Sequence, residues 1–308
     1  MRNVWIGLSL FVVQLVLTFK GSAWLGKYLN PVVLFSISMA LPVLFLRQRL
    51  DTGSNPPVSK PSGYRPWIGA GLGLLAMLLC YEELRKLFVQ FAVPRDYSDV
   101  IPQLEMLYIR FRDGIFPYAP VDMGSYQPYP VYMPMHWLPV FFADKFHVDS
   151  RWIGYGILAL AHAGFGFALA RKHTISVRTI IAILLPSLAL WAFILWGTLD
   201  IPISYELVIA AYYLVLAFGL YTRNTVVIAL GLVLCLLSRY TLVFWIPLFA
   251  VLLWWNKPWK TSVAVWGAAA AAFILLYLLP FYAKDPSILT KGVTYHLFVG
   301  NWLHHLLS

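Results

Sequence analysis

The feature that most constrains this chain is a series of apolar runs, each about 20 residues long. A helix needs about 20 mainly apolar residues to cross a bilayer, and only a segment that bonds its own backbone groups is stable there. We therefore predict an all-α polytopic membrane protein, a single transmembrane domain over residues 1–308 with about nine transmembrane helices (roughly eight to eleven). The candidate spans are 3–19, 30–46, 66–92, 151–170, 177–196, 203–221, two short spans within 224–256, and 260–282.

Composition supports a membrane protein over a large soluble domain. Of the residues, 60% are hydrophobic and only 12% are charged, whereas soluble domains average about 25% charged residues. The first apolar run has no small-residue cleavage site before Lys20, so we expect it to stay as a helix and not to be removed as a signal peptide. Cys80 and Cys235 lie inside apolar runs and are interpreted as small buried hydrophobic residues.

The basic residues predict an orientation. The polar segment 47–66 carries several Lys and Arg residues, and Arg171-Lys172-His173 ends another apolar run. Positive charge at the ends of spans marks the cytoplasmic side, so we attribute the net charge of +10 to topology and expect no nucleic-acid partner. By this rule residues 93–150 form a loop on the non-cytoplasmic side, and 283–308 form a non-cytoplasmic C-terminal segment.

The 93–150 loop is rich in acidic residues and contains segments whose apolar residues are spaced as in helices. Residues 100–112 have apolar positions at helical spacing, as in a helix that lies on a membrane. Residues 130–146 are apolar but short and interrupted by prolines, so we expect a re-entrant or interfacial helix there. Long connections of this kind are usually functional, and we predict that this loop is catalytic. Its part 95–139 holds five of the thirteen acidic residues, namely Asp96, Asp99, Glu105, Asp113 and Asp122.

Two of these carboxylates stand where the span 66–92 should emerge from the membrane. Asp96 and Asp99 flank Tyr97-Ser98. A carboxylate at the rim of a membrane cavity can act as general base toward a hydroxyl, or can hold a divalent cation with water. The alternative is that both are solvated charges at the interface.

Arg239 is the second candidate, because it interrupts the apolar run 224–256. An arginine inside such a run is costly unless it faces a cavity or a partner, and its planar fork suits phosphate. The alternative is a structural salt bridge to another helix, for which Asp200 is one available carboxylate. No pair of histidines has metal-ligand spacing on one helix face, so we predict no zinc site.

Five short motifs follow one another over about 95–250. They are Asp96-Tyr97-Ser98-Asp99, Gly114-Ile115-Phe116-Pro117-Tyr118, Tyr129-Pro130 or Tyr132-Met133-Pro134-Met135, Gly197-Thr198-Leu199-Asp200, and Ser238-Arg239-Tyr240 before Ile246-Pro247. Taken in order, these motifs resemble the GT-C superfamily of polytopic glycosyltransferases, and within it glycosyltransferase family 87 and the GPI-mannosyltransferase-like group. The chain differs from the family pattern at Thr198, which replaces an amide, at Arg239, which replaces a lysine, and in lacking a double proline after the motif tyrosine.

The resemblance implies a GT-C-like fold and an inverting transfer of a mannose-like hexose or a pentose. The donor would be a polyprenyl-phosphate sugar, and the acceptor a hydroxyl of a glycan, lipid or protein. Asp99 would be the general base, and Asp96 would orient it or share a divalent cation, Mg²⁺ or Mn²⁺, with it. Arg239 and Tyr240 would bind the donor phosphate, which becomes the leaving group.

The resemblance also implies which side chains contact sugar. Tyr118, Tyr129, Tyr132 and Trp137 would stack on sugar rings, although aromatic residues at a membrane surface are equally typical of the interfacial belt. Hydrogen bonds to sugar hydroxyls would come from His136, Asp200 and His296.

Two other function classes remain open on the sequence. One is a non-catalytic membrane subunit of a glycan- or lipid-processing complex, which would require an additional membrane partner. The other is a transporter or flippase of lipid-linked glycans, which would place its charges within spans near the midplane. For the enzyme we expect a bacterial inner membrane with a periplasmic active site, or an endoplasmic-reticulum membrane with a lumenal one.

Overall fold

The computed structural model describes residues 63–92, 98–124, 126–196, 200–239 and 258–288, with a few positions between and after these ranges. Contacts divide the chain into two units, Met1–Pro61 and Ser62–Ser308, and every described residue belongs to the second. All regular elements of the described residues are helices. The predicted spans 3–19 and 30–46 lie outside the described residues, as does most of 240–257.

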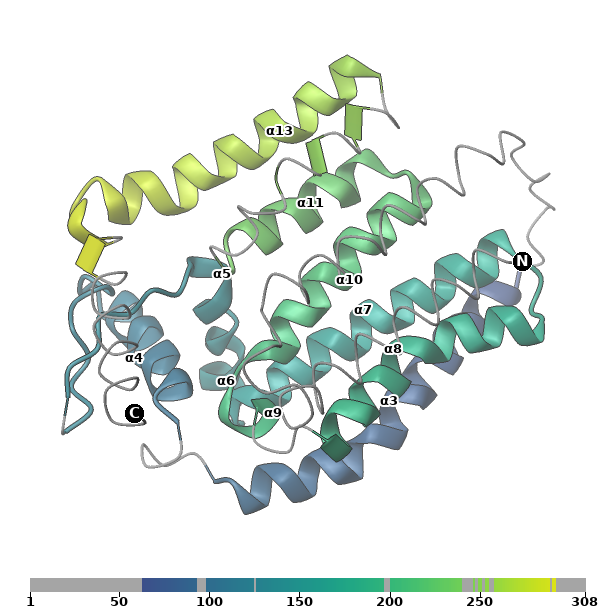
Figure 1. Cartoon of the computed structure of the whole chain (residues 1–308), viewed down its shortest axis with the longest axis horizontal. Coiled ribbons are helices and arrows are strands. Elements are labelled where there is room, and N and C mark those ends of the chain that lie inside the picture. Colours follow the sequence, from purple (N-terminus) through teal and green to yellow (C-terminus); the bar gives the residue numbers. More distant parts are fainter. Residues whose placement is uncertain are drawn as a thin grey trace, which may run out of the picture. The chain divides into compact units, whose positions relative to one another are not determined.

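Four described helices are long and apolar enough to cross a membrane (Figure 1). They occupy the predicted spans 66–92, 151–170, 177–196 and 260–282, so the prediction of apolar helices of membrane-spanning length is confirmed at these positions. The last one changes from α to π winding at Ile274 but continues without a break. They are α3 (Arg65–Gln90), α7 (Ser150–Lys172), α8 (Val177–Trp196), and α13 (Trp259–Phe273) with η3 (Ile274–Tyr282).

Two shorter apolar helices, α10 (Glu206–Thr222) and α11 (Thr225–Leu236), form a tight hairpin. Asn224 caps α11, because its side chain accepts hydrogen bonds from the backbone of the first turn. The helix expected over 203–221 begins later than predicted, since Asp200–Ile203 forms a separate one-turn helix, α9. α11 ends just before Arg239, as expected from the polar break in the run 224–256, whose second half lies largely outside the described residues.

α3 and α7 pack closely because both present glycine at their crossing. A Cβ added at Gly69 would meet the backbone oxygen of Gly166, and would lie 2.5 Å from the Cβ of Ala170. One added at Gly73 would lie 2.9 Å from the carbonyl oxygen of His162. Small residues let two backbones approach this closely within a membrane, where packing is a main source of helix association.

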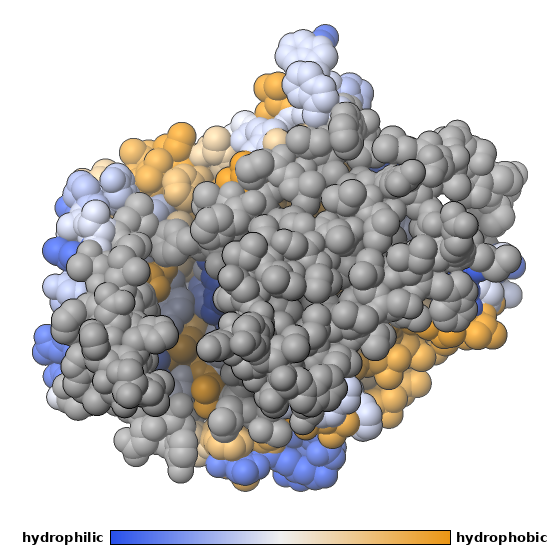
Figure 2. Space-filling view, viewed as in Figure 1, coloured by the Kyte–Doolittle hydropathy of each residue, from blue (hydrophilic) through white to orange (hydrophobic). Residues whose placement is uncertain are grey.

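The outward faces of these helices are apolar. In Figure 2 hydrophobic residues gather along the lower right, where Figure 1 draws α3 and α8. Leu78 and Leu79 of α3 are 63% and 71% exposed, and Trp191 and Leu195 of α8 are also exposed. A contiguous apolar surface of this kind is unusual in soluble proteins and suits contact with lipid.

The charges in the second half of α3 pair with one another. Arg85 forms an ion pair with Glu82 at 2.6 Å, and Lys86 with Glu83 at 2.7 Å. All four side chains are at least 40% exposed. This exposure favours an extension of the helix into the membrane interface over a face turned to protein.

Three helices of the 93–150 loop lie at one end of the long helices, here called the loop end (Figure 1). They are α4 (Val100–Arg112), α5 (Pro134–Trp137) and α6 (Val140–Phe146). Both helical predictions for the loop are confirmed, although 130–146 divides into two pieces around Pro139. Arg110 fixes the connection after α4, because its guanidinium donates to the carbonyl oxygens of Pro117, Ala119 and Pro120.

Candidate functional site

The candidate site is built where α4, α5 and the start of α10 meet at the loop end. Ser98 precedes α4, and its hydroxyl donates to the carbonyl oxygen of Ile203 at the end of α9. Met135 of α5 donates its backbone N–H to the carbonyl oxygen of Leu237, at 2.8 Å. These bonds bring the loop against the ends of α9 and α11, so that side chains far apart in the sequence face a common region.

Asp99 is the N-terminal flanking residue of α4, and its carboxylate does not cap the helix. Instead, Oδ2 accepts a hydrogen bond of 3.0 Å from Nε2 of Gln103, one turn later. The Asp99 side chain is half-buried, whereas Gln103 is buried. A buried amide therefore orients a partly accessible carboxylate, as a general base or a ligand for a cation requires.

Arg239 forms an ion pair with Glu206, the first residue of α10. Both side chains are 40% exposed, so the guanidinium is paired and still accessible. The sequence had offered Asp200 as a partner for this arginine, and the structure gives Glu206 instead. Asp200 begins α9, but its side chain lies outside the described part of the chain.

The charges of Asp99, Glu206 and Arg239 all act on the hydroxyl group of Tyr132. Burial is the main cause that raises the pKa of its hydroxyl, and the carboxylates of Asp99 and Glu206 raise it further. The guanidinium of Arg239 acts in the opposite direction on the same pKa. Asp99, Glu206 and Arg239 therefore lie in the neighbourhood of the Tyr132 hydroxyl.

His136 is completely buried in α5, between two tyrosine rings. Its imidazole meets the Tyr132 ring edge-on at 5.1 Å and stacks on the Tyr205 ring at 6.2 Å. Burial, and secondarily the positive charge of Arg239, lower the pKa of His136 to about 3. The imidazole is therefore neutral at neutral pH and carries one donor and one acceptor.

The other predicted stacking residues have different surroundings. Tyr118 and Trp137 are 3% and 0% exposed, and both pack on Phe281 of η3. The Tyr118 hydroxyl donates to the carbonyl oxygen of Tyr132 and accepts from Nε1 of Trp137. These two rings fill the core of the loop and have no face open to a sugar. Tyr129 is half-buried, with the Lys291 ammonium 5.8 Å from its ring centre.

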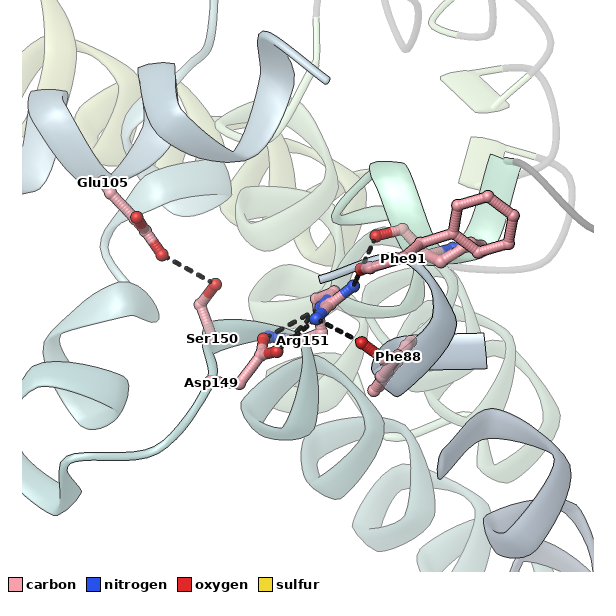
Figure 3. A network of polar contacts seen from close by, with 7 residues as sticks. Phe88, Phe91, Glu105, Asp149, Ser150 and Arg151 are labelled. Carbon is pink, nitrogen blue, oxygen red and sulfur yellow. Dashed lines mark hydrogen bonds and ion pairs between the residues drawn. The ribbon is translucent and has the colours of Figure 1, made fainter. Parts of the chain in front are cut away.

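A second group of charges lies beside α3 and lines an open cleft of about 580 Å³ (Figure 3). Glu105 and Asp149 provide carboxylates, and Phe88, Val89 and Ala92 provide an apolar wall. Burial is the main cause that raises the pKa of Glu105, and the nearby Asp149 adds to the effect. The Ser150 hydroxyl donates to Glu105 at 3.2 Å.

Arg151 completes this group but is almost fully buried, with 3% of its side chain exposed. It pairs with Asp149 and donates to the carbonyl oxygens of Phe88, Phe91 and Pro202 (Figure 3). All N–H groups of its guanidinium donate to protein atoms. Its function is therefore to join the ends of α3, α7 and α9, and not to bind a ligand.

Several predicted site residues fall outside the described part of the chain, namely Asp96, Tyr240 and His296. Within the part that is described, no three His, Cys, Asp or Glu side chains lie close enough together to hold a metal ion. The cation predicted at Asp96 and Asp99 stays a prediction, because one of its two ligands is not described.

Sequence reasoning did not single out Gln103, Tyr205 or Glu206, which the structure brings to the site. Gln103 lies one turn after Asp99 on α4, so helical spacing alone could have identified it. Nothing in the sequence indicates that Tyr205 and Glu206 approach a loop more than sixty residues earlier.

Comparisons with known proteins add no relative. No family model, no curated protein and no solved structure matches the chain.

Proposed function

We propose that this protein is an integral-membrane glycosyltransferase of the GT-C type. It would transfer a sugar from a polyprenyl-phosphate donor to an acceptor hydroxyl on the non-cytoplasmic face, with inversion at the anomeric carbon. The observation that carries the proposal is geometric: the hydrogen bonds of Ser98 and Met135 bring Asp99, which Gln103 orients, and the accessible guanidinium of Arg239 to the same end of helices that are long and apolar enough to cross a membrane. A carboxylate, an aromatic ring and an accessible guanidinium are the groups that this reaction needs together.

Each group has a chemical task. Asp99, oriented by Gln103, removes the proton from the acceptor hydroxyl as its oxygen attacks the anomeric carbon. The bond from that carbon to the phosphate oxygen breaks at the same time, and the lipid phosphate leaves with the bonding electrons. Arg239 stabilises the negative charge of this leaving group, exchanging part of its contact with Glu206 for the phosphate.

Membrane location follows from the substrates. A polyprenyl chain remains in the lipid, so its phosphate is presented at the membrane surface. The apolar outward faces of α3 and α8 lie in the same molecule as the loop that carries Asp99. The cleft beside Glu105, with its apolar wall, offers a place for an amphiphilic acceptor. The proposal also includes a divalent cation, Mg²⁺ or Mn²⁺, which Asp96 and Asp99 would bind.

The test is sugar transfer in liposomes from a panel of polyprenyl-phosphate hexoses and pentoses. Asp99→Asn keeps the size of the side chain and its contact with Gln103 but removes the base. We expect kcat to fall by about 10²-fold or more. Adding EDTA to the same assay tests the cation, and a loss of activity restored by Mg²⁺ or Mn²⁺ would support it.

Asp122→Asn is the matched control. Asp122 is an exposed carboxylate of the same loop, and its side-chain oxygen accepts from the backbone of Gly124, which asparagine can also do. Full activity in this variant with loss in Asp99→Asn would assign the base. Equal activity in the two variants would exclude Asp99 as the general base and leave Asp96 as the next candidate.

The subunit and transporter classes predict different results. A non-catalytic subunit shows no turnover alone and tolerates Asp99→Asn in the assembled complex. A flippase moves the lipid-linked sugar across the bilayer without changing it chemically. In the described residues the charges gather at helix ends and in the loop, which favours chemistry at the surface over a midplane transport site.

A further inference from the structure

The cleft beside α3 is lined by two carboxylates but, among the described residues, by only one cation (Figure 3). The guanidinium of Arg151 pairs with Asp149 and donates its remaining N–H groups to backbone carbonyl oxygens. Within the described part of the chain, Glu105 accepts a single side-chain hydrogen bond, from the Ser150 hydroxyl at 3.2 Å. The lining therefore carries one negative charge in excess, and it lies on Glu105.

Burial makes that charge costly unless a cation approaches it. Glu105 is half-buried, and burial is the main cause that raises its pKa, while Asp149 raises this pKa further and Arg151 lowers it. The other titratable group nearby is the hydroxyl of Tyr205, whose pKa both carboxylates raise, so it stays neutral and supplies no positive charge. A positive group in contact with a desolvated carboxylate stabilises its ionised form. The cleft therefore favours a cationic ligand.

The apolar wall of the cleft limits the kind of cation. Phe88, Val89 and Ala92 form this wall at the end of α3, a helix long and apolar enough to cross a membrane. Val89 is 71% exposed, so an alkyl chain can reach it from the lipid. A metal ion would need several oxygen ligands, and Arg151 already holds Asp149. A volume of about 580 Å³ is typical of small-molecule sites.

We propose that this cleft binds an amphiphile whose polar group is a primary ammonium, with the ammonium on Glu105 and the alkyl chain along Phe88 and Val89. A primary ammonium has three N–H donors, so it can donate to Glu105 and to the hydroxyl oxygen of Ser150 together. An anionic headgroup is repelled by the excess negative charge. The inference deepens the proposed function, on which it rests where this amphiphile is taken as the acceptor, but the binding is measured without transfer.

The test is photo-crosslinking of the full chain in phosphatidylcholine nanodiscs, with dodecylammonium that carries a diazirine in its chain. We expect labelling of α3 around Val89. In Glu105→Gln, which keeps the size of the side chain and its bond from Ser150, half-saturation should need about 10-fold or more probe, because a charged hydrogen bond is lost. Asp122→Asn removes an exposed carboxylate of the same loop and should label like the wild type. Dodecyl sulfate with the same diazirine should label α3 only weakly.

The pH dependence and a filled cleft give two further readouts. Lowering the pH protonates Glu105 while the amine stays charged, and because the pKa of Glu105 is raised, labelling should be lost at a higher pH than an ordinary glutamate would give. Glu105→Gln should show no such loss. Ala92→Trp places a large ring in the cleft from an exposed position, where folding is not disturbed, and should reduce labelling at every pH.

Sugar transfer, measured in parallel, separates the two proposals. Equal half-saturation in the wild type and Glu105→Gln, or equal labelling by dodecyl sulfate and dodecylammonium, would overturn the amine site. If labelling depends on Glu105 but no sugar is transferred from any donor, the glycosyltransferase proposal fails and the amine site stands. If sugar is transferred and dodecylammonium neither labels α3 nor inhibits the transfer, the amine site is wrong and the glycosyltransferase proposal stands.

Discussion

At the residue scale, the molecule separates charges that hold structure from charges that remain accessible. Arg151 is buried and bonded to four groups of protein, whereas Arg239 is 40% exposed and, among the described residues, forms one ion pair. Both are arginines near the ends of apolar helices, and the sequence around them does not distinguish their roles. The difference lies in the number of carbonyl oxygens that tertiary packing brings to each guanidinium.

Arg151→Met should destabilise the protein strongly. The change keeps an unbranched side chain but leaves the carboxylate of Asp149 and the carbonyl oxygens of Phe88, Phe91 and Pro202 without their donor. Removing one partner of a buried pair costs about 3–5 kcal/mol. Thermal unfolding in detergent measures the loss.

Arg112→Met is the control for that substitution. Arg112 also forms ion pairs, with Asp113 at 2.9 Å and Asp144 at 3.2 Å, but 46% of its side chain is exposed. Exposed pairs contribute little to stability because water screens them, so Tm should change little. Similar losses in both variants would contradict the structural role given to Arg151.

At the element scale, helix positions follow from apolar runs, and helix contacts follow from side-chain size. α3 and α7 touch through Gly69 and Gly166, where no room is left for a Cβ. Gly71 lies on the same helix only two residues away, yet a Cβ there would meet nothing within 4 Å. The sequence shows glycine at both positions, and only the packing tells which one is required.

Gly69→Ala should lower Tm, and Gly71→Ala should not. At Gly69 the added methyl group forces the two backbones apart, and overpacking of this kind costs about 1–3 kcal/mol. At Gly71 the methyl group enters open space, and replacing a helical glycine gains up to about 1 kcal/mol. Equal Tm values for the two variants would contradict the close crossing of α3 and α7.

At the scale of the whole molecule, charge is distributed between the two ends of the helices. Lys172 at the end of α7 donates to the carbonyl oxygen of Tyr221 at the end of α10, which places these two termini together. Arg178 and Arg223 lie next to the same termini in sequence. The carboxylates of the site belong to the opposite ends. The orientation itself stays a prediction from the basic segments.

Thiol labelling tests that orientation. A membrane-impermeant maleimide should label Asp122→Cys in sealed spheroplasts or intact microsomes from the side that the site faces. Arg178→Cys should react only after the membrane is permeabilised. The native cysteines give little background, because Cys80 and Cys235 are 2% and 1% exposed. Labelling of both positions from one side would overturn the proposed topology.

Several parts of the fold could be predicted without coordinates. The helices over 66–92, 151–170, 177–196 and 260–282 lie where apolar runs require them, since an apolar segment in lipid must bond its own backbone. The amphipathic helix over 100–112 was predictable from its spacing. The late start of α10 could not be predicted in this way. Pro202 lies where polar residues give way to apolar ones, and the sequence there allows either one continuous helix or two helices.

The candidate site divides in the same way. The sequence by itself determined the membrane-spanning helices, the acidic loop and the candidacy of Asp99 and Arg239, because these depend on local composition and charge. Only the tertiary structure decided that Glu206 pairs with Arg239, that Tyr118 and Trp137 are core, and that Tyr205 lies against His136. Each of these depends on contacts between segments distant in sequence, and burial of a polar ring cannot be read from the residues beside it in the chain.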